Sequence, residues 1–181
     1  MTPFTLNLRG RLAEYSRPVV MGVLNVTPDS FYSGSRAQTH ADITRRARQL
    51  VADGADMLDV GAYSSRPGAD DVSADEELRR LEAGLSAVRE AVGYDIPVSV
   101  DTFRADVARR AVEWGADIIN DISGGLLDEG MFETVADLHV PYILMHMRGT
   151  PATMQTMTDY TDVVADVIGE LSHKLSRLEE L

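Results

Sequence analysis

Short apolar runs alternate with longer helical patterns along this chain, and each run ends next to a polar residue. The five runs cover residues 19–24, 57–60, 98–100, 118–119 and 142–145. Each run is nearly continuous in apolar residues, as expected for strands of a parallel sheet that are buried on both faces. The alternation predicts successive parallel βα units and therefore an α/β fold.

Apolar residues at helical spacing fill the segments that follow the predicted strands. The five predicted faces are Ile43, Ala47, Leu50 and Val51; Leu78, Leu81, Leu85, Val88 and Val92; Val107, Ala111 and Trp114; Met131, Val135 and Leu138; and Val163, Val167, Leu171, Leu175 and Leu178. Ser73 and Glu76 have the spacing of a capping box, which predicts the start of the second helix. Ahead of the first strand, a short hairpin through Gly10 is expected.

One six-residue pattern occurs twice. Residues 54–59 read GADMLD and residues 115–120 read GADIIN. Each copy combines a helix-ending glycine, a tight turn and a strand with a polar tip, as successive units of a (βα) barrel would. The chain has 181 residues and no evident linker, so residues 1–181 are predicted to form a single domain.

Charge and composition exclude several classes of partner. The net charge of −12 argues against nucleic acid and anionic membrane surfaces, because both would be repelled. An anionic small molecule would need local help from arginines, backbone amides or a bound cation. The chain has no cysteine, which excludes disulfides and thiolate chemistry. No segment has the pattern of a signal peptide or a membrane span, so a cytoplasmic protein is expected.

Polar residues at the strand ends are the candidate site. They are Asn25, Asp59, Asp101, Asn120 with Asp121, and His146. Parallel α/β folds place their chemistry at the carboxyl ends of the strands, so these residues are predicted to share one face of an active site. The loops over residues 26–38 and 62–72 follow two of these strands and are longer than most βα connections, which favours a binding role.

Two features of the strand ends suggest how a ligand would bind, and each has a structural alternative. Asp101 beside Asn120 suits a heterocycle with an amino group next to a ring N–H, but the same pair could simply orient a loop. Asn25 could serve as one protein ligand of Mg²⁺, because magnesium keeps water and substrate phosphates as its other ligands. The alternative is a turn in which Asn25 binds its own backbone. Arg66 and Arg148 could contact a diphosphate, although lone arginines are usually solvated.

Other motifs narrow the choice further. The chain lacks a Walker A loop, a G-x-G-x-x-G after the first strand, an H-E-x-x-H and a G-x-S-x-G. Nucleotide folds and covalent serine chemistry are therefore disfavoured. His146 ends an apolar run and is as consistent with a structural role as with ligand contact.

Several segments carry a resemblance to a known family. Residues 21–31 read MGVLNVTPDSF and residues 59–69 read DVGAYSSRPGA, followed in order by VDT at 100–102, INDI at 119–122 and MHM at 145–147. These segments resemble the signatures of the dihydropteroate synthases, which are TIM-barrel enzymes of folate synthesis and sulfonamide targets. The resemblance implies condensation of 6-hydroxymethyl-7,8-dihydropterin diphosphate with p-aminobenzoate, giving dihydropteroate and diphosphate.

The resemblance also implies residue roles. Asn25, Asp101 and Asn120 would be the catalytic residues, with Asp101 and Asn120 bonding the pterin and Ile122 and Met145 packing on it. Asn25 would bind Mg²⁺ and, with Ser65 and Arg66, the diphosphate. The p-aminobenzoate site and its loops would involve Phe31, Ser65, Arg66 and Pro67.

The sequence also departs from the family pattern. Ala62 and Tyr63 stand where the family often has Gly followed by Glu or Gln, Ser65 stands at a common Thr, and Ser33 at a common Asp. Five βα units cannot close an eight-stranded barrel, so the expectation is an incomplete TIM barrel with an open edge and little or no activity alone. A homo-oligomer formed through that non-native surface is one expectation.

Two rival functions stay open at this point. One is a related pterin-binding methyltransferase barrel, although its members lack the signatures around Asn25 and Ser65. The other is a non-catalytic binding or assembly module that pairs its open sheet edge with another chain.

Overall fold

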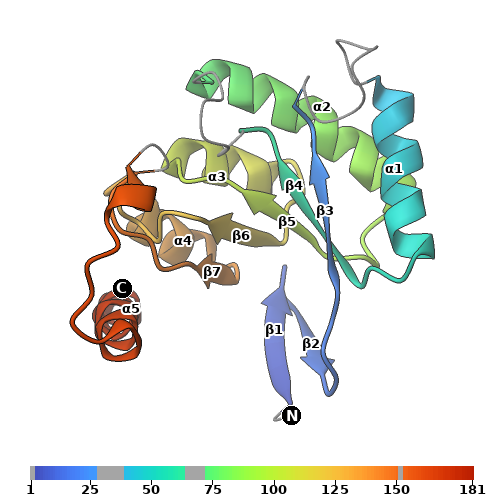
Figure 1. Cartoon of the computed structure of the whole chain (residues 1–181). Helices are drawn as coiled ribbons and strands as arrows, with labels where there is room; N and C mark the ends of the chain where they lie inside the picture. The colour runs from blue at the N-terminus through green and yellow to red at the C-terminus, as the bar shows by residue number, and fades with distance from the viewer. Residues whose placement is uncertain (1–2, 28–38, 64–71, 151–152) are drawn as a thin grey trace.

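The computed structural model describes residues 3–27, 39–63, 72–150 and 153–181 (Figure 1). Its main sheet contains β3 (Met21–Asn25), β4 (Met57–Gly61), β5 (Val98–Asp101), β6 (Ile118–Asp121) and β7 (Tyr142–Leu144). The strands are parallel and neighbour one another in chain order. This arrangement confirms the predicted succession of βα units.

Five helices of the described residues follow the strands in chain order, and all but the last lie along the sheet (Figure 1). They are α1 (His40–Ala52), α2 (Ala74–Val92), α3 (Ala105–Glu113), α4 (Met131–Leu138) and α5 (Val163–Glu180), with a short 3₁₀ helix, η1 (Met154–Thr156), before α5. Each predicted helical face falls within one of these helices, except that Trp114 is the residue just after the end of α3. Among the described residues, every helix is too short or too polar to pass through a bilayer.

The core lies between the sheet and its helices. Leu24, Val60 and Val100 point from the strands into it and are almost fully buried. Gly84 of α2 packs closely against Val26, the residue after β3: an added Cβ would lie 3.0 Å from Val26 Cγ1. A larger residue at this position would push α2 away from the end of β3.

The prediction of strands buried on both faces holds for β4, where every residue is buried, and is wrong for the edge strands β3 and β7, whose opposite face is partly exposed. Val23 lies on this face and is 59% exposed, and Ile143 is 37% exposed. In the described part of the chain, β3 pairs only with β4 and β7 only with β6. The sheet is therefore open at both edges, as expected for an incomplete barrel.

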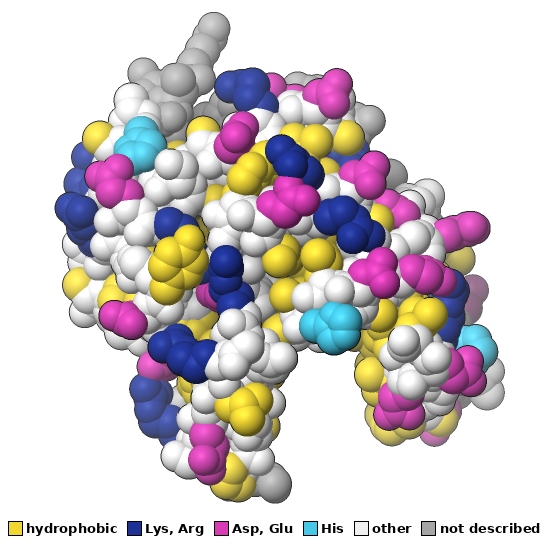
Figure 2. Space-filling view, turned by 180° about the vertical axis from the view of Figure 1, so that it is seen from behind, with side chains coloured by type: hydrophobic (Ala, Val, Ile, Leu, Met, Phe, Trp, Pro, Cys, Tyr) yellow, Lys and Arg dark blue, Asp and Glu magenta, His cyan; other side chains and the backbone are white. Residues whose placement is uncertain are grey.

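The N-terminal hairpin is present and covers one end of this open face. It comprises β1 (Phe4–Leu8) and β2 (Arg11–Tyr15), joined through Arg9 and Gly10. Leu8 packs in a small cluster with Met57 and Ile118, at the amino ends of the strands. Figure 2 shows the molecule from behind, with the hairpin and α5 projecting as separate arms. The carboxyl ends of the strands stay clear of the hairpin.

The repeated six-residue pattern forms the same structure twice. Gly54 and Gly115 have φ of 105° and 109°, a conformation that favours glycine. In each copy the aspartate two residues later accepts a hydrogen bond from the start of a neighbouring strand: Asp56 from Val20 N at 2.9 Å and Asp117 from Val98 N at 2.8 Å. The repeat therefore sets the register at the amino ends of the strands.

Helix α2 starts where the capping pattern predicted, but only half of the capping box forms. Ser73 Oγ accepts a hydrogen bond from Glu76 N at 3.3 Å. The Glu76 carboxylate instead binds Arg79 and Arg80, at 2.7 Å from each. A complete capping box forms at α1, between Thr39 and Asp42, where none was predicted. At α2, Arg79 and Arg80 bind the Glu76 carboxylate, which therefore does not bind the backbone N–H of Ser73.

Leu85 gives a direct test of the core, because it is fully buried between the sheet and the helices. Leu85→Ala should lower the free energy of unfolding by about 3 kcal/mol through lost burial and a cavity. Leu12→Ala is the control: Leu12 is 74% exposed on the hairpin, and its loss should change stability by less than about 0.5 kcal/mol. Urea denaturation measures both, and equal losses would contradict this account of the core.

Candidate functional site

The strand-end residues lie in one row across the sheet. Asn25 pairs with Gly61, Gly61 with Asp101, Asp101 with Asn120, and Asn120 with Ile143. Side chains alternate between the two faces of a strand, so the row shares the open face with residues two positions earlier. That second row contains Asp59 and Ser99. The sheet register thus brings together the polar tips from four neighbouring strands.

Gly61 leaves space in the middle of the row. A Cβ added there would lie 3.0 Å from Asn25 Oδ1 and 3.6 Å from Asp101 Oδ2. The Asn25 amide and the Asp101 carboxylate therefore converge above a residue that has no side chain. Any larger residue would fill the space between these two oxygens.

Asp59 lies below the row and holds Asn120. Asn120 Nδ2 donates a hydrogen bond to Asp59 Oδ2 at 3.2 Å. Among the described residues, Asp59 Oδ1 and Ser99 Oγ are buried and make no hydrogen bond. Ser99 is near enough to favour the ionised carboxylate, although the two groups are not in bonding geometry. A buried oxygen without a hydrogen-bond donor is energetically unfavourable.

Burial changes the ionisation of both site carboxylates. Loss of solvation raises the pKa of Asp101 to about 7, and the negative charges of Asp59, Glu77 and Asp121 contribute further. Burial also raises the pKa of Asp59, and the Asn120 hydrogen bond acts against that rise. Near neutral pH, Asp101 can therefore be a hydrogen-bond donor or an acceptor. Groups with such perturbed ionisation concentrate at functional sites.

Asp121 follows Asn120 in β6 but has a structural role. It is fully buried, and its carboxylate accepts hydrogen bonds from Ser123 N at 2.7 Å, Gly125 N at 2.8 Å and the Tyr142 hydroxyl at 2.7 Å. These bonds shape the loop that carries the half-buried Ile122. The prediction paired Asp121 with Asn120 at one tip, but the pleat of the strand sends the two side chains to opposite faces.

Met145 gives the row an apolar border. It is 41% exposed and directly follows β7. The loop after β6 packs closely against it, because a Cβ on Gly124 would lie only 2.3 Å from the Met145 carbonyl oxygen. Exposed apolar surface beside Asn120 is suitable for a flat ring.

His146 and Arg148 are bound to α5. His146 Nε2 lies 2.8 Å from Glu170 Oε2, and Arg148 Nε donates to Glu170 Oε1 at 2.9 Å. The Arg148 guanidinium also stacks on Tyr160, 3.9 Å from the ring centre. A contact between Arg148 and a diphosphate, as predicted, would have to compete with these interactions.

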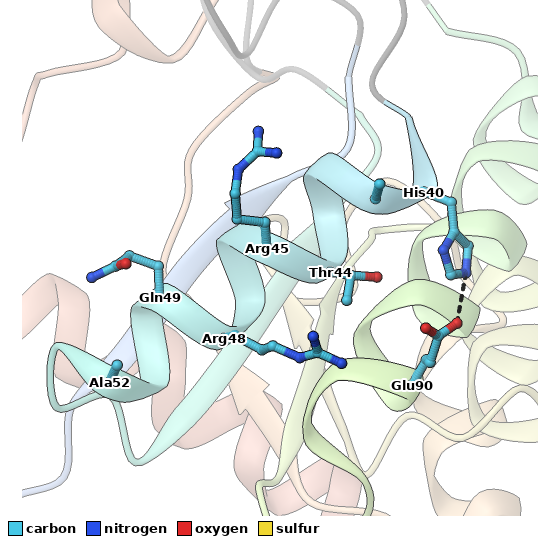
Figure 3. A pocket seen from close by; sticks show the side chains of 8 residues that line it. His40, Thr44, Arg45, Arg48, Gln49, Ala52 and Glu90 are labelled. Carbon is cyan, nitrogen blue, oxygen red and sulfur yellow. Dashed lines mark ion pairs between the residues drawn. The ribbon is translucent and has the colours of Figure 1, made fainter.

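A surface groove between α1 and α2 lies away from the strand ends (Figure 3). Its polar side chains are largely engaged: His40 lies 3.5 Å from Glu90, Arg45 binds Asp42, and Gln49 donates to Asp53 at 2.7 Å. The groove contains none of the strand-end residues.

The sequence predicted most of this arrangement. Asn25, Asp101 and Asn120 share one row, as expected for strand tips, and Ile122 and Met145 directly follow β6 and β7. Asp59 was predicted to be a strand tip on the candidate face without an assigned role, and the structure shows that it binds Asn120. The predicted residues Phe31, Ser65, Arg66 and Pro67 lie outside the described residues.

The geometry defines a class: an α/β protein that binds its ligand at the carboxyl ends of parallel strands. Comparison with known proteins makes this more specific. Residues 21–181 match the model of the pterin binding enzymes, so the chain belongs to that family.

The matched relatives include dihydropteroate synthases and longer folate synthesis proteins, such as a bifunctional protein of Pisum sativum that is 46% identical over 94% of this chain and 34% of its own length. The chain is 40% identical to the dihydropteroate synthase of Escherichia coli K12 over 172 residues, covering 95% of this chain and 60% of the relative. The structure matches Xanthomonas albilineans dihydropteroate synthase with 4-aminobenzoic acid at a TM-score of 0.85 and 40% identity, covering 99% of this chain and 62% of the other. A Xanthomonas albilineans complex with 7,8-dihydropteroate matches at 0.79 and 37% identity, covering 97% of this chain and 60% of the other. The chain thus spans about three fifths of these dihydropteroate synthases, and the fold is confirmed as part of a TIM barrel.

The ionisation of Asp101 is directly measurable. Carboxyl ¹³C NMR should show it titrating at about 7 rather than at its ordinary 3.8. Asp59→Asn should lower that pKa, because a neighbouring negative charge is removed. Between pH 3.8 and about 7, Asp101 is protonated in the folded chain and ionised in the unfolded chain. The free energy of unfolding should therefore fall as pH rises through this range. A titration near 4 in the unsubstituted chain would contradict the buried environment.

Proposed function

We propose that this chain forms the pterin-binding part of a dihydropteroate synthase. The reaction condenses 6-hydroxymethyl-7,8-dihydropterin diphosphate with p-aminobenzoate to give dihydropteroate and diphosphate. The observation that carries the proposal is the row of Asn25, Gly61, Asp101 and Asn120, with Asp59 beneath it, in a member of the pterin-binding family.

Pterin recognition follows from complementary hydrogen bonding. The amino group and ring N–H of a pterin are donors that suit the Asp101 carboxylate. The Asn120 amide offers both a donor and an acceptor, and Asp59 fixes its orientation through the Nδ2 hydrogen bond. Ile122 and Met145 would pack on the faces of the ring. Together these groups recognise both the edge and the face of a flat heterocycle.

Magnesium fits the Asn25 end of the row. The described residues contain no group of three carboxylates or imidazoles that could hold a metal alone. Magnesium needs few protein ligands, however, and Asn25 Oδ1 points into the space above Gly61. When bound with substrate, the metal would neutralise charge that builds up on the departing diphosphate. Asn25 is the residue that would hold it.

The other proposed roles concern residues outside the described ranges. Phe31, Ser65 and Pro67 would shape the p-aminobenzoate site, and Arg66 with Ser65 would contact the diphosphate. Sulfonamides, as analogues of p-aminobenzoate, would compete there. A cytoplasmic location is proposed from the acidic composition and the soluble substrates.

The proposal includes dependence on further βα units. An eight-stranded barrel needs three strands more than the described sheet has. Exposed Val23, Ile143 and Met145 on the open face are the surface that those units would cover. The exposed apolar surface and open edges also support self-association of the isolated chain as an alternative. The active form would have a closed barrel.

Pterin binding tests the proposed site. Calorimetry of the 181-residue chain with 6-hydroxymethyl-7,8-dihydropterin diphosphate should show binding that strengthens with Mg²⁺. Asp101→Ala and Asn120→Ala should each weaken affinity by at least about tenfold, since each leaves pterin groups unpaired. The exposed Glu113→Gln is the control. If the unsubstituted chain shows no binding with Mg²⁺ present, the proposed site is wrong. Stable oligomers in such a sample would favour the assembly module.

Complementation tests the need for further units. Adding the part of the Escherichia coli relative that lies beyond the aligned region, as a separate polypeptide, should produce dihydropteroate. Neither piece should do so alone. Asn25→Ala should abolish the recovered activity if Asn25 holds the metal. Robust formation of dihydropteroate by the 181-residue chain alone would contradict the proposed need for further units.

A further inference from the structure

One buried carboxylate near the site is not among the residues proposed to bind a ligand. Glu77, in the first turn of α2, is fully buried. Thr102 Oγ1 donates a hydrogen bond to Glu77 Oε1 at 2.7 Å, and the Arg104 guanidinium forms an ion pair with Glu77 Oε2. A buried carboxylate is strongly unfavourable without such partners. The loss of Arg104 would therefore force these residues to rearrange.

Besides Glu77, Arg104 contacts one backbone carbonyl and two aromatic rings. Its Nη2 donates to the Val72 carbonyl at 2.8 Å. Its guanidinium lies 4.9 Å from the ring centre of Phe103 and 5.4 Å from that of Tyr63, and the two rings meet edge to face. A planar guanidinium suits this combination of ion pairing and stacking. Arg104 thus joins the end of β4, the start of α2 and the start of α3.

Thr102 connects this cluster to the pterin end of the site. Its hydroxyl accepts from Arg104 N at 3.2 Å while donating to Glu77, and its own backbone N–H donates to the Asn120 carbonyl at 3.0 Å. Thr102 directly follows Asp101 and is 1% exposed. The ends of β5 and β6, which carry Asp101 and Asn120, are therefore held on one side by the Arg104–Glu77 pair.

We propose that Arg104, through its ion pair with Glu77, is a positioning residue that holds Asp101 and Asn120 in the geometry that binds a pterin. Arg104 contacts α2 and the aromatic rings and does not belong to the strand-end row. This inference rests on the proposed function. The second buried ion pair, between Arg89 and Asp117, lies at the amino ends of the strands and should leave the site unaffected.

The experiment uses the whole chain and three variants. Arg104→Gln removes the charge, Arg104→Lys restores it, and Arg79→Gln removes an exposed arginine that pairs with Glu76 on the same helix as Glu77. The first readout is the affinity for 7,8-dihydropteroate, measured by calorimetry. The second is amide hydrogen exchange of Thr102 N–H, compared with Leu58 N–H, which bonds to the Pro97 carbonyl at the far end of the sheet.

Arg104→Gln should weaken dihydropteroate binding by about tenfold, while Arg104→Lys recovers most of the affinity and Arg79→Gln matches the unsubstituted chain. Exchange at Thr102 should accelerate in Arg104→Gln, with Leu58 unchanged. Equal acceleration at both amides would show a purely structural role and overturn the proposal, as would unchanged affinity. If the unsubstituted chain does not bind dihydropteroate, the proposed function fails, and the exchange ratio still decides whether Arg104 orders the strand ends.

Discussion

Parallel pairing in register is the constraint on which the rest of this structure depends. Because Asn25, Gly61, Asp101 and Asn120 are direct partners across four strands, a shift of one residue in any strand would turn its polar tip toward the helices. The repeated glycine and aspartate turns set that register at the opposite end, where Asp56 and Asp117 bind the first amides of neighbouring strands. The contacts that set the register therefore lie at the amino ends of the strands, and the candidate site lies at their carboxyl ends.

The acidic side chains around the strand ends differ in their bonding partners. Glu77 is paired with Arg104 and Thr102, and Asp121 is surrounded by loop amides and the Tyr142 hydroxyl. Among the described residues no cation pairs with Asp59, which is buried, or with Asp101, which is partly buried, and loss of solvation raises the pKa of each. The acids that support the site are fully hydrogen-bonded, whereas Asp59 Oδ1 has no hydrogen-bond partner among the described residues.

Several features were predictable because they depend on short stretches of sequence. The strands, the helical faces, the hairpin through Gly10 and the meeting of Asn25, Asp101 and Asn120 all follow from local patterns and from the common direction of parallel strands. The capping box at Ser73 failed because Arg79 and Arg80 compete for Glu76. Burial on both faces was correct for the central strand β4 and wrong for β3 and β7, because the edge strands lack a neighbour on one side among the described residues. The different fates of Asn120 and Asp121 depended on the strand pleat, which residue type does not reveal.

By itself, the sequence determined the order of elements, the family and the polar strand tips, since each is encoded in contiguous residues. Only the tertiary structure decided which tips cooperate. It showed that Asp59 binds Asn120. It also showed that His146 and Arg148 bind Glu170 on α5, and that Arg104 and Thr102 both bind Glu77. These contacts join residues far apart in the chain. Their partners are chosen by packing distance and by the free energy of burying charge, and neither can be read from the sequence near any one of them.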